Sequence, residues 1–152
     1  MEIRPQAKAD TEAIAAWRYP GRYSTYDVGD VAEIDASANG WAVTHEDELV
    51  GYCSFGASAR VPEIEAEEGA LDVGYGMRPD LMGRGLGRAF VAAILDFGVK
   101  EFSPQRLRVH ILSWNERSRK VAAALGFEEE RIAPSSQGDF VVMVWSPQSP
   151  DA

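Results

Sequence analysis

The chain reads LDVGYGMRPDLMGRGLGR over residues 71–88, and this stretch determines the predicted fold class. Apolar residues alternate with small or polar ones from Leu71 to Met77, which is typical of a strand with one buried face. After a cluster of glycines, apolar residues recur at i, i+4, i+7, i+8 and i+11 from Leu86 to Phe97, which predicts an amphipathic helix. A second strand is expected at Leu107–Ile111. This strand–helix–strand unit should be a right-handed crossover between two parallel strands.

The segments on either side of this unit predict further strands and helices. Before it we expect an extended segment at Ile3–Pro5, a helix capped by Asp10 or Thr11, and a hairpin of strands Trp41–Thr44 and Leu49–Phe55. After it we expect a helix from Asn115 to Leu125 that ends at Gly126, and an antiparallel pair at Glu128–Ile132 and Phe140–Trp145. The order favours an α+β (mixed α/β) fold built on a single sheet. One domain is predicted over residues 1–146, followed by a flexible tail at 147–152.

The composition argues against several classes of protein. The chain has 152 residues, 45% of them apolar, and 24 acidic against 15 basic side chains, for a net charge of −9. This apolar content suits a folded domain, and the negative charge disfavours nucleic-acid binding. No apolar run approaches the ~20 residues that span a bilayer, and the first residues do not form a signal peptide. One cysteine and two histidines offer no metal cluster. We therefore expect a cytoplasmic protein without membrane, nucleic-acid or metal partners.

The glycine cluster at residues 83–87 is suited to binding an anion. Glycines between a strand and a helix leave backbone N–H groups open, and the helix dipole adds roughly +0.5 charge there. Arg84 and Arg88 place two cations beside these groups, so a phosphate or pyrophosphate is the expected ligand. The Lys-Ser or Lys-Thr of a Walker A loop is missing, and Arg88 stands where the dinucleotide fingerprint needs a glycine. A glycine-rich turn that only packs helix against strand is a second interpretation.

Residues 74–88 resemble the acyl-CoA pyrophosphate motif of the GNAT superfamily of N-acyltransferases. Gly85 and Gly87 fill the two small positions of the family pattern Gln/Arg-x-x-Gly-x-Gly/Ala, whereas Met82 departs from it at the first position. Two further segments are similar to family elements, namely Asn115-x-x-Ser118-x-x-Val121-x-x-x-Leu125-Gly126-Phe127 and the strand Asp72-Val-Gly-Tyr75. Their spacing is most similar to the branch that includes ribosomal-protein N-terminal acetyltransferases.

The resemblance implies a single GNAT-like domain with a twisted, mostly antiparallel sheet, one splayed pair of parallel strands and flanking helices. It implies acetyl-CoA as the acyl donor, with the pantetheine arm between the splayed strands, and no metal. Backbone groups near Tyr75–Met77 would bind the arm, and an N–H there would stabilise the oxyanion. The expected cofactor-binding residues are Tyr75, Met77, Met82, Gly83, Arg84, Gly85, Leu86, Gly87, Arg88, Asn115 and Ser118. Ordinary strand pairing is the alternative for Tyr75–Met77, and a local N-cap is the alternative for Asn115.

The resemblance also implies direct attack of an amine on the thioester in a ternary complex. The predicted catalytic residues are Asp72 as proton acceptor, directly or through water, Ser118 facing the thioester sulfur, and Asn115 on the pantetheine arm. A solvated carboxylate at a strand edge is the alternative for Asp72. Ala122 stands where many family members carry a tyrosine that protonates the thiolate, so Ser118, water or unassisted departure must replace it. Met82 and Ala122 together motivate a second interpretation, a catalytically weak acyl-CoA-binding or sensing module.

Tyr19, Tyr23 and Tyr26, together with Asp72, are the predicted contacts of the acceptor. Aromatic rings in this segment can line a pocket or hold a cation, and core packing is the alternative. The acceptor is expected to be an amine-bearing small molecule or a protein N-terminus. Residues 1–77 carry 15 acidic and 5 basic side chains, whereas residues 78–120 carry 4 and 9, so cationic acceptors are expected. Cys53 should be buried and inert, and His110 should lie opposite the Val109 face of its strand.

Overall fold

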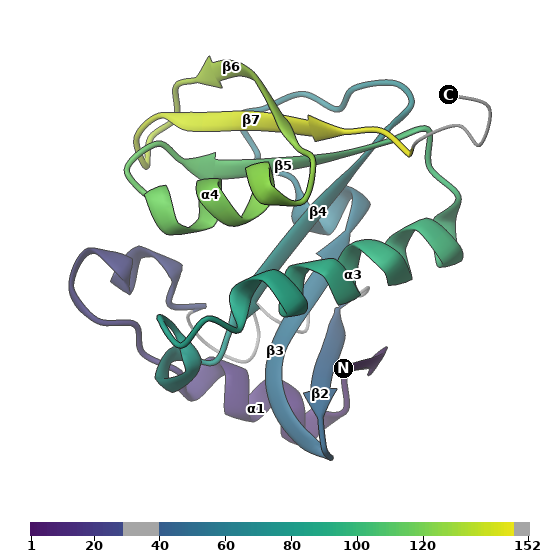
Figure 1. The fold of residues 1–152 in the computed structure, drawn as a ribbon. Helices are drawn as coiled ribbons and strands as arrows, with labels where there is room; N and C mark the ends of the chain where they lie inside the picture. The colour runs from purple at the N-terminus through teal and green to yellow at the C-terminus, as the bar shows by residue number, and fades with distance from the viewer. Residues whose placement is uncertain (29–39, 148–152) are drawn as a thin grey trace.

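The computed structural model describes residues 1–28 and 40–147 (Figure 1). In chain order its elements are β1 (Glu2–Pro5), α1 (Lys8–Ala16), the 3-10 helix η1 (Gly21–Tyr26), β2 (Trp41–His45), β3 (Glu48–Phe55), η2 (Gly56–Ala59), β4 (Ala70–Met77), η3 (Pro79–Leu81), α3 (Gly87–Phe102), β5 (Arg106–Leu112), α4 (Glu116–Ala124), β6 (Glu128–Ala133) and β7 (Phe140–Trp145). The predicted tail lies outside the described residues from position 148 onward. None of the helices in the described ranges has the length and apolar character needed to cross a membrane.

Seven strands form one sheet in the order β1-β2-β3-β4-β5-β7-β6. Neighbouring strands are antiparallel except β4 and β5, which are parallel as predicted. The β4–β5 ladder ends at the pair Asp72–Arg108, whereas β3 accompanies β4 to Met77 and β7 accompanies β5 to Leu112. Beyond Asp72 each strand is held only by its outer neighbour, and Figure 1 shows the two strands diverging. The α+β fold with a splayed parallel pair is therefore confirmed.

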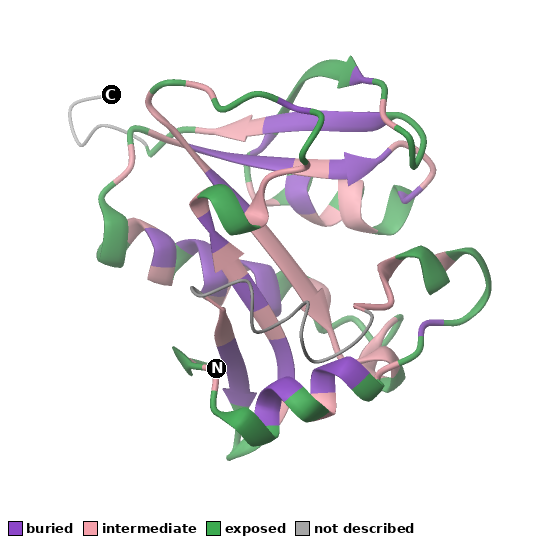
Figure 2. Cartoon of the chain, turned by 180° about the vertical axis from the view of Figure 1, so that it is seen from behind, coloured by how far each residue is buried: buried purple, intermediate pink, exposed green. Residues whose placement is uncertain are grey.

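Helices α3 and α4 cover one face of the sheet and α1 covers the other (Figure 1 and Figure 2). Phe90 of α3 and Ala122 of α4 belong to the main core cluster, together with Cys53 and Val109. On the opposite side, Ile14 of α1 packs in a cluster that includes Tyr52 of β3. We call these two sides the α3 face and the α1 face. Cys53 is fully buried, and burial raises its pKa to about 12, which confirms the predicted inert thiol.

Local sequence explains both ends of α4 and the start of α1. Asn115 caps α4 as predicted, since its Oδ1 accepts a hydrogen bond from the Ser118 N–H at 3.2 Å, and Gly126 follows the helix at a φ of +101°. Helix α1 begins earlier than predicted, with Ala7 as its N-cap residue and Asp10 inside its first turn. Asp10 accepts a hydrogen bond from the Ala7 N–H at 2.8 Å. The prediction of a cap at Asp10 or Thr11 was therefore wrong, because a carboxylate at the third helical position reaches back to the helix start from inside.

Candidate functional site

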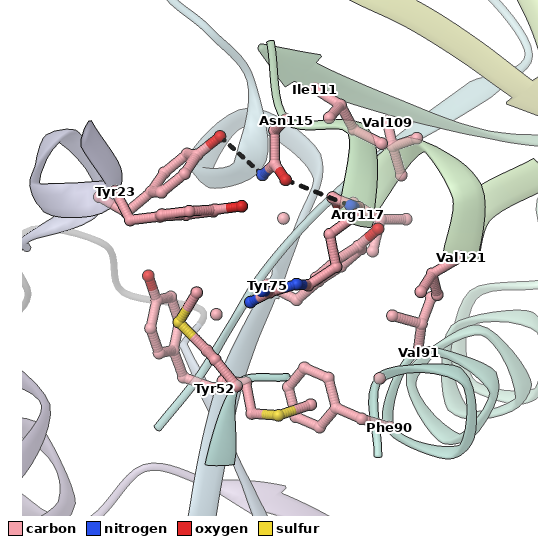
Figure 3. A pocket seen from close by; sticks show the side chains of 18 of the residues that line it. Tyr23, Tyr52, Tyr75, Phe90, Val91, Val109, Ile111, Asn115, Arg117 and Val121 are labelled. Carbon is pink, nitrogen blue, oxygen red and sulfur yellow. Dashed lines mark hydrogen bonds between the residues drawn. The ribbon is translucent and has the colours of Figure 1, made fainter. Parts of the chain in front are cut away.

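A cavity of about 630 Å³ lies where β4 and β5 diverge (Figure 3). Val73 of β4 and Val109 of β5 belong to the core cluster on the α3 face. Because side chains alternate along a strand, Gly74 and His110 face the opposite side of the sheet, as predicted for His110. Residues of both sides line this one cavity. The cavity therefore passes between the two strands, from the α3 face to the α1 face.

Backbone groups of β4 point into the gap. The Arg78 N–H donates to the Val50 carbonyl oxygen at 2.8 Å, and the register continues from this pair along β3 and β4. Because hydrogen-bonded pairs alternate in an antiparallel ladder, Tyr75 and Met77 direct their N–H and C=O groups away from β3 and toward the gap. The Met77 carbonyl oxygen accepts a hydrogen bond from the Tyr19 hydroxyl at 2.6 Å. The two N–H groups are thus available to an oxygen atom in the cavity.

The loop before α3 forms one end of the cavity. Gly83 and Gly85 have φ angles of +75° and +78°, which glycine adopts without steric cost. A β-carbon built at Gly85 would have no atom within 4 Å, so the space above it is open. The N-cap residue Leu86 makes no side-chain hydrogen bond, and the first N–H groups of α3 therefore stay open to an anion. Of the predicted loop residues, Met82, Gly83, Gly85, Gly87 and Arg88 line the cavity, whereas Arg84 and Leu86 are exposed outside the lining.

Arg117 of α4 adds a cation that the sequence did not indicate. Its Nη2 lies 3.5 Å from the position of a β-carbon built at Gly83, and its Cζ lies 5.6 Å from the centroid of the Tyr23 ring. The guanidinium thus reaches from the glycine loop to η1. A single arginine in the first turn of a helix is too common to indicate a site, so only its position across the cavity identifies it.

Asn115, Ser118 and Tyr75 line the cavity together. The Asn115 amide donates to the Tyr26 hydroxyl at 3.0 Å while its Oδ1 caps α4 (Figure 3). The capping role of Asn115 is therefore confirmed, and its contact with a ligand stays a prediction. Burial raises the pKa of Tyr75 to about 12, against the effect of the nearby Ser118 hydroxyl. Ala122 is fully buried in the core behind them.

The three predicted tyrosines form the other end of the cavity, where Tyr19, Tyr23 and Tyr26 all line it. The Tyr23 and Trp114 rings meet edge to face with centroids 5.2 Å apart, and Tyr26 lies 5.9 Å from the same indole. These contacts fix the rings as a wall. Tyr52 of β3 also lines the cavity, although its sequence position inside an ordinary strand did not suggest this.

Asp72 differs from both of its sequence-based interpretations. Its side chain is 0% exposed and does not line the cavity. Arg108 donates to both carboxylate oxygens at 2.6 and 3.1 Å, and Arg60 donates to Oδ2 at 2.7 Å. Burial raises the pKa of Asp72, but these hydrogen bonds outweigh it and hold the pKa below its usual value. A solvated carboxylate is therefore excluded. Because both oxygens are occupied and the charged form is favoured, the geometry supports an anchoring role rather than the predicted proton transfer or acceptor contact.

The four glutamates between η2 and β4 do not line the cavity; they are Glu63, Glu65, Glu67 and Glu68. Glu63 accepts hydrogen bonds from Ser136, the shortest at 2.9 Å, and Glu67 pairs with Arg106 at 3.7 Å. These glutamates therefore tie the segment to the second half of the sheet instead of presenting charge to an acceptor. Within the ranges 1–28 and 40–147, no group of three or more His, Cys, Asp or Glu residues could hold a metal ion.

Residues 1–128 match the family described as Acetyltransferase (GNAT) domain. A curated protein, the "Uncharacterized N-acetyltransferase p20" of Bacillus licheniformis, is 26% identical over 90 residues. The matched region covers 59% of this chain and 47% of that protein, so it spans about half the length of the relative.

Solved structures of similar fold cover nearly the whole chain. The aminoglycoside acetyltransferase AAC(6')-Ib in complex with coenzyme A has a TM-score of 0.77 at 16% identity, over 95% of this chain and 93% of that one. A spermidine N-acetyltransferase SpeG chimera from Vibrio cholerae and hSSAT has a TM-score of 0.75 at 14% identity, over 95% and 94%. The protein yncA from Salmonella typhimurium, solved with its cofactor acetyl-CoA, has a TM-score of 0.68 at 20% identity, over 99% of this chain and 96% of that one. At these identities the likeness shows the fold alone.

Proposed function

Because the chain belongs to the GNAT acetyltransferase family, we propose that it transfers the acetyl group of acetyl-CoA to an amine by direct attack in a ternary complex. The observation that carries this proposal is the cavity that crosses the sheet, with an anion-binding loop at one end and an aromatic wall at the other. A donor and an acceptor held at the two ends meet between the strands. Holding both reactants in line supplies much of the rate enhancement without a covalent intermediate.

The donor end fits a CoA thioester. The open space above Gly85 and the free N–H groups of α3 receive a pyrophosphate. Coenzyme A carries roughly −4 charge, about −2 from its pyrophosphate and about −1.5 to −2 from its 3′-phosphate. Arg88 and Arg117 line the cavity at this end, with Arg84 exposed beside them. Crystal structures of AAC(6')-Ib and yncA, which hold coenzyme A and acetyl-CoA, share this fold.

The chain's own groups then act on the thioester. The N–H groups of Tyr75 and Met77 point into the gap, where they stabilise the negative charge that develops on the carbonyl oxygen. Ser118 faces the cavity from α4 and is the proposed proton donor to the departing thiolate, with Asn115 holding the start of that helix. Ala122 lies in the core and provides no proton. A thiol has a pKa of about 8.5, so the thiolate is a fair leaving group with little assistance.

The acceptor is proposed to be a primary amine on a small molecule or at a protein N-terminus. Tyr19, Tyr23 and Tyr26 provide a wall of mutually inclined aromatic rings against which the acceptor packs. An aminoglycoside acetyltransferase and a spermidine N-acetyltransferase share the fold, which supports the small-molecule class. The motif spacing that resembles the ribosomal-protein branch supports a protein N-terminus as the acceptor. None of the three solved structures described above is named as an enzyme that acts on a protein N-terminus.

A thiol-release assay with acetyl-CoA and a panel of amines tests the proposal. The panel contains an aminoglycoside, spermidine, free amino acids and short peptides with a free N-terminus. Acetyl-CoA binding is measured in parallel by calorimetry. We expect binding of acetyl-CoA and amine-dependent thiol release well above hydrolysis in buffer. Tight binding without turnover on any amine would instead favour the acyl-CoA-binding module that Met82 and Ala122 suggested, and absence of binding would refute both.

A further inference from the structure

His110 is a buried imidazole that has no hydrogen-bond partner within the described part of the chain. Its side chain is 2% exposed, and neither Nδ1 nor Nε2 has a partner there. Its Nε2 lies 3.8 Å from Oδ1 of Asp72, but both Asp72 oxygens already accept hydrogen bonds from arginines. Buried polar groups without a partner are rare in folded proteins and call for an explanation. His110 lines the cavity, so a ligand in the cavity can supply the partner.

The imidazole lies on the α1 face of the gap, on the side opposite to the proposed donor. The glycine loop and α3 bring the donor from the α3 face, whereas His110 faces the α1 side. Continuing the β4–β5 register beyond Asp72–Arg108 places Gly74 level with His110 across the gap. A β-carbon built at Gly74 would lie 3.2 Å from Ser54 Oγ and 3.4 Å from the Ala59 β-carbon, so a larger residue at this position would close the cavity beside His110. Ala59 and Val61 complete the lining there with small side chains.

Burial and nearby arginines keep His110 neutral at pH 7. Burial is the main cause that lowers the pKa of His110 to about 4; Asp72 opposes it, and Arg108, Arg131 and Arg60 contribute to the lowering. These four groups come from β5, β6, the segment before β4, and β4. A neutral imidazole keeps one ring nitrogen with a free lone pair. This lone pair can accept a proton, and the low pKa means that the ring passes the proton readily to water.

We propose that His110 accepts the proton that the acceptor amine loses during acetyl transfer, a role that rests on the proposed acetyltransferase function. The amine lone pair forms the C–N bond at the thioester carbon, and the C–S bond breaks with its electron pair on the departing sulfur. The amine proton moves to the free ring nitrogen of His110 and passes from there to water. His110 thus has the role of proton acceptor that was predicted for Asp72, whose two oxygens are bonded to arginines.

Replacing His110 by alanine and adding imidazole tests this role. We expect kcat of the His110→Ala variant to fall about 100-fold, as for loss of a general base, with the Kd for acetyl-CoA changed by less than about twofold. Added imidazole should restore part of kcat, because the small side chain leaves room for it. The His110→Gln variant keeps the volume and a hydrogen-bonding side chain but no basic nitrogen, and it should show the same loss without rescue. The matched control is His45→Ala, since His45 is the other histidine and is exposed at the end of β2.

The outcomes separate this proposal from the function it rests on. If the wild-type protein releases thiol with an amine and both His110 variants retain kcat within about threefold, the role of His110 is refuted and the acetyltransferase function stands. If kcat falls without imidazole rescue while His110→Gln stays active, the imidazole is a packing element and the proposal fails. If the wild-type protein turns over no amine, both proposals fail. Circular dichroism and the Kd for acetyl-CoA show whether each variant is folded.

Discussion

Replacing Asp72 by asparagine removes the carboxylate at the centre of a buried ion-pair network with Arg108 and Arg60. Asp72 is 0% exposed and the Arg108 side chain is 2% exposed. Their Nε–Oδ1 distance is 2.6 Å, and Arg60 lies 2.7 Å from the other oxygen. Breaking a buried pair by removing one partner costs about 3–5 kcal/mol, because the remaining charge is left uncompensated. Asparagine keeps one acceptor oxygen but turns an N–H₂ group toward a guanidinium.

We expect the Asp72→Asn variant to lose about 3 kcal/mol of unfolding free energy, at the low end of that range. Two features soften the loss: Arg108 also donates to the Glu65 carbonyl oxygen at 2.8 Å, and the Arg60 side chain is 27% exposed and can turn to water. In a protein of this size such a loss corresponds to a fall of roughly 6–12 °C in Tm. Urea unfolding at pH 7, followed by circular dichroism, measures it.

The matched control is Asp80→Asn, which breaks the Arg78–Asp80 pair. That pair has the same 2.6 Å distance, but its carboxylate is exposed, so we expect little change in stability because solvent screens it. Equal stabilities of the two variants would refute the anchoring role of Asp72. A large loss of kcat in folded Asp72→Asn, with wild-type stability, would instead restore the proton acceptor predicted from the sequence.

Two further predictions follow from the glycine loop and from His110. Gly85→Val should abolish acetyl-CoA binding in calorimetry, whereas the control Gly56→Val should not. The φ angles are +78° and +79° and both sites are sterically open, so both variants should lose a similar ~1–2 kcal/mol of stability to backbone strain. Equal affinities of the two variants for acetyl-CoA would contradict the anion-binding role of the glycine loop. The pKa of His110 is lowered from 6.5 to about 4 in the folded protein. As the pH falls, the unfolded chain therefore binds this proton before the folded protein does. The free energy of unfolding should fall by about 3 kcal/mol between about pH 6.5 and pH 4. Urea titrations over this range should show a smaller fall for His110→Asn, and identical pH profiles would count against the buried neutral imidazole.

Features that depend on neighbouring residues were predictable. The N-cap at Asn115 and the glycine after α4 arise from hydrogen bonds and φ angles within a few positions. The anion-binding loop is equally local, since its glycines and the first turn of α3 are consecutive in the chain. The predicted cap at Asp10 was wrong by about one turn, because a carboxylate can accept hydrogen bonds at a helix start either as the N-cap residue or from the third helical position.

Features that depend on register were not predictable. The partner of Asp72 is 36 positions away on a parallel strand, and only the pairing of β4 with β5 brings the two together. The same pairing decides where the ladder stops. It thereby sets which side chains of β5 border the gap, and His110 becomes part of the cavity for this reason.

The sequence by itself determined the order of the elements, the family resemblance and the anion-binding loop, because each depends on residues that are close together along the chain. The tertiary structure alone decided that Asp72 is an anchor, that Arg117 reaches across the cavity from α4 to the glycine loop and η1, and that His110 stands unpartnered beside the gap. These roles depend on side chains from distant strands and helices that meet only after folding. Burial, which sets their charge state, exists only in the folded protein.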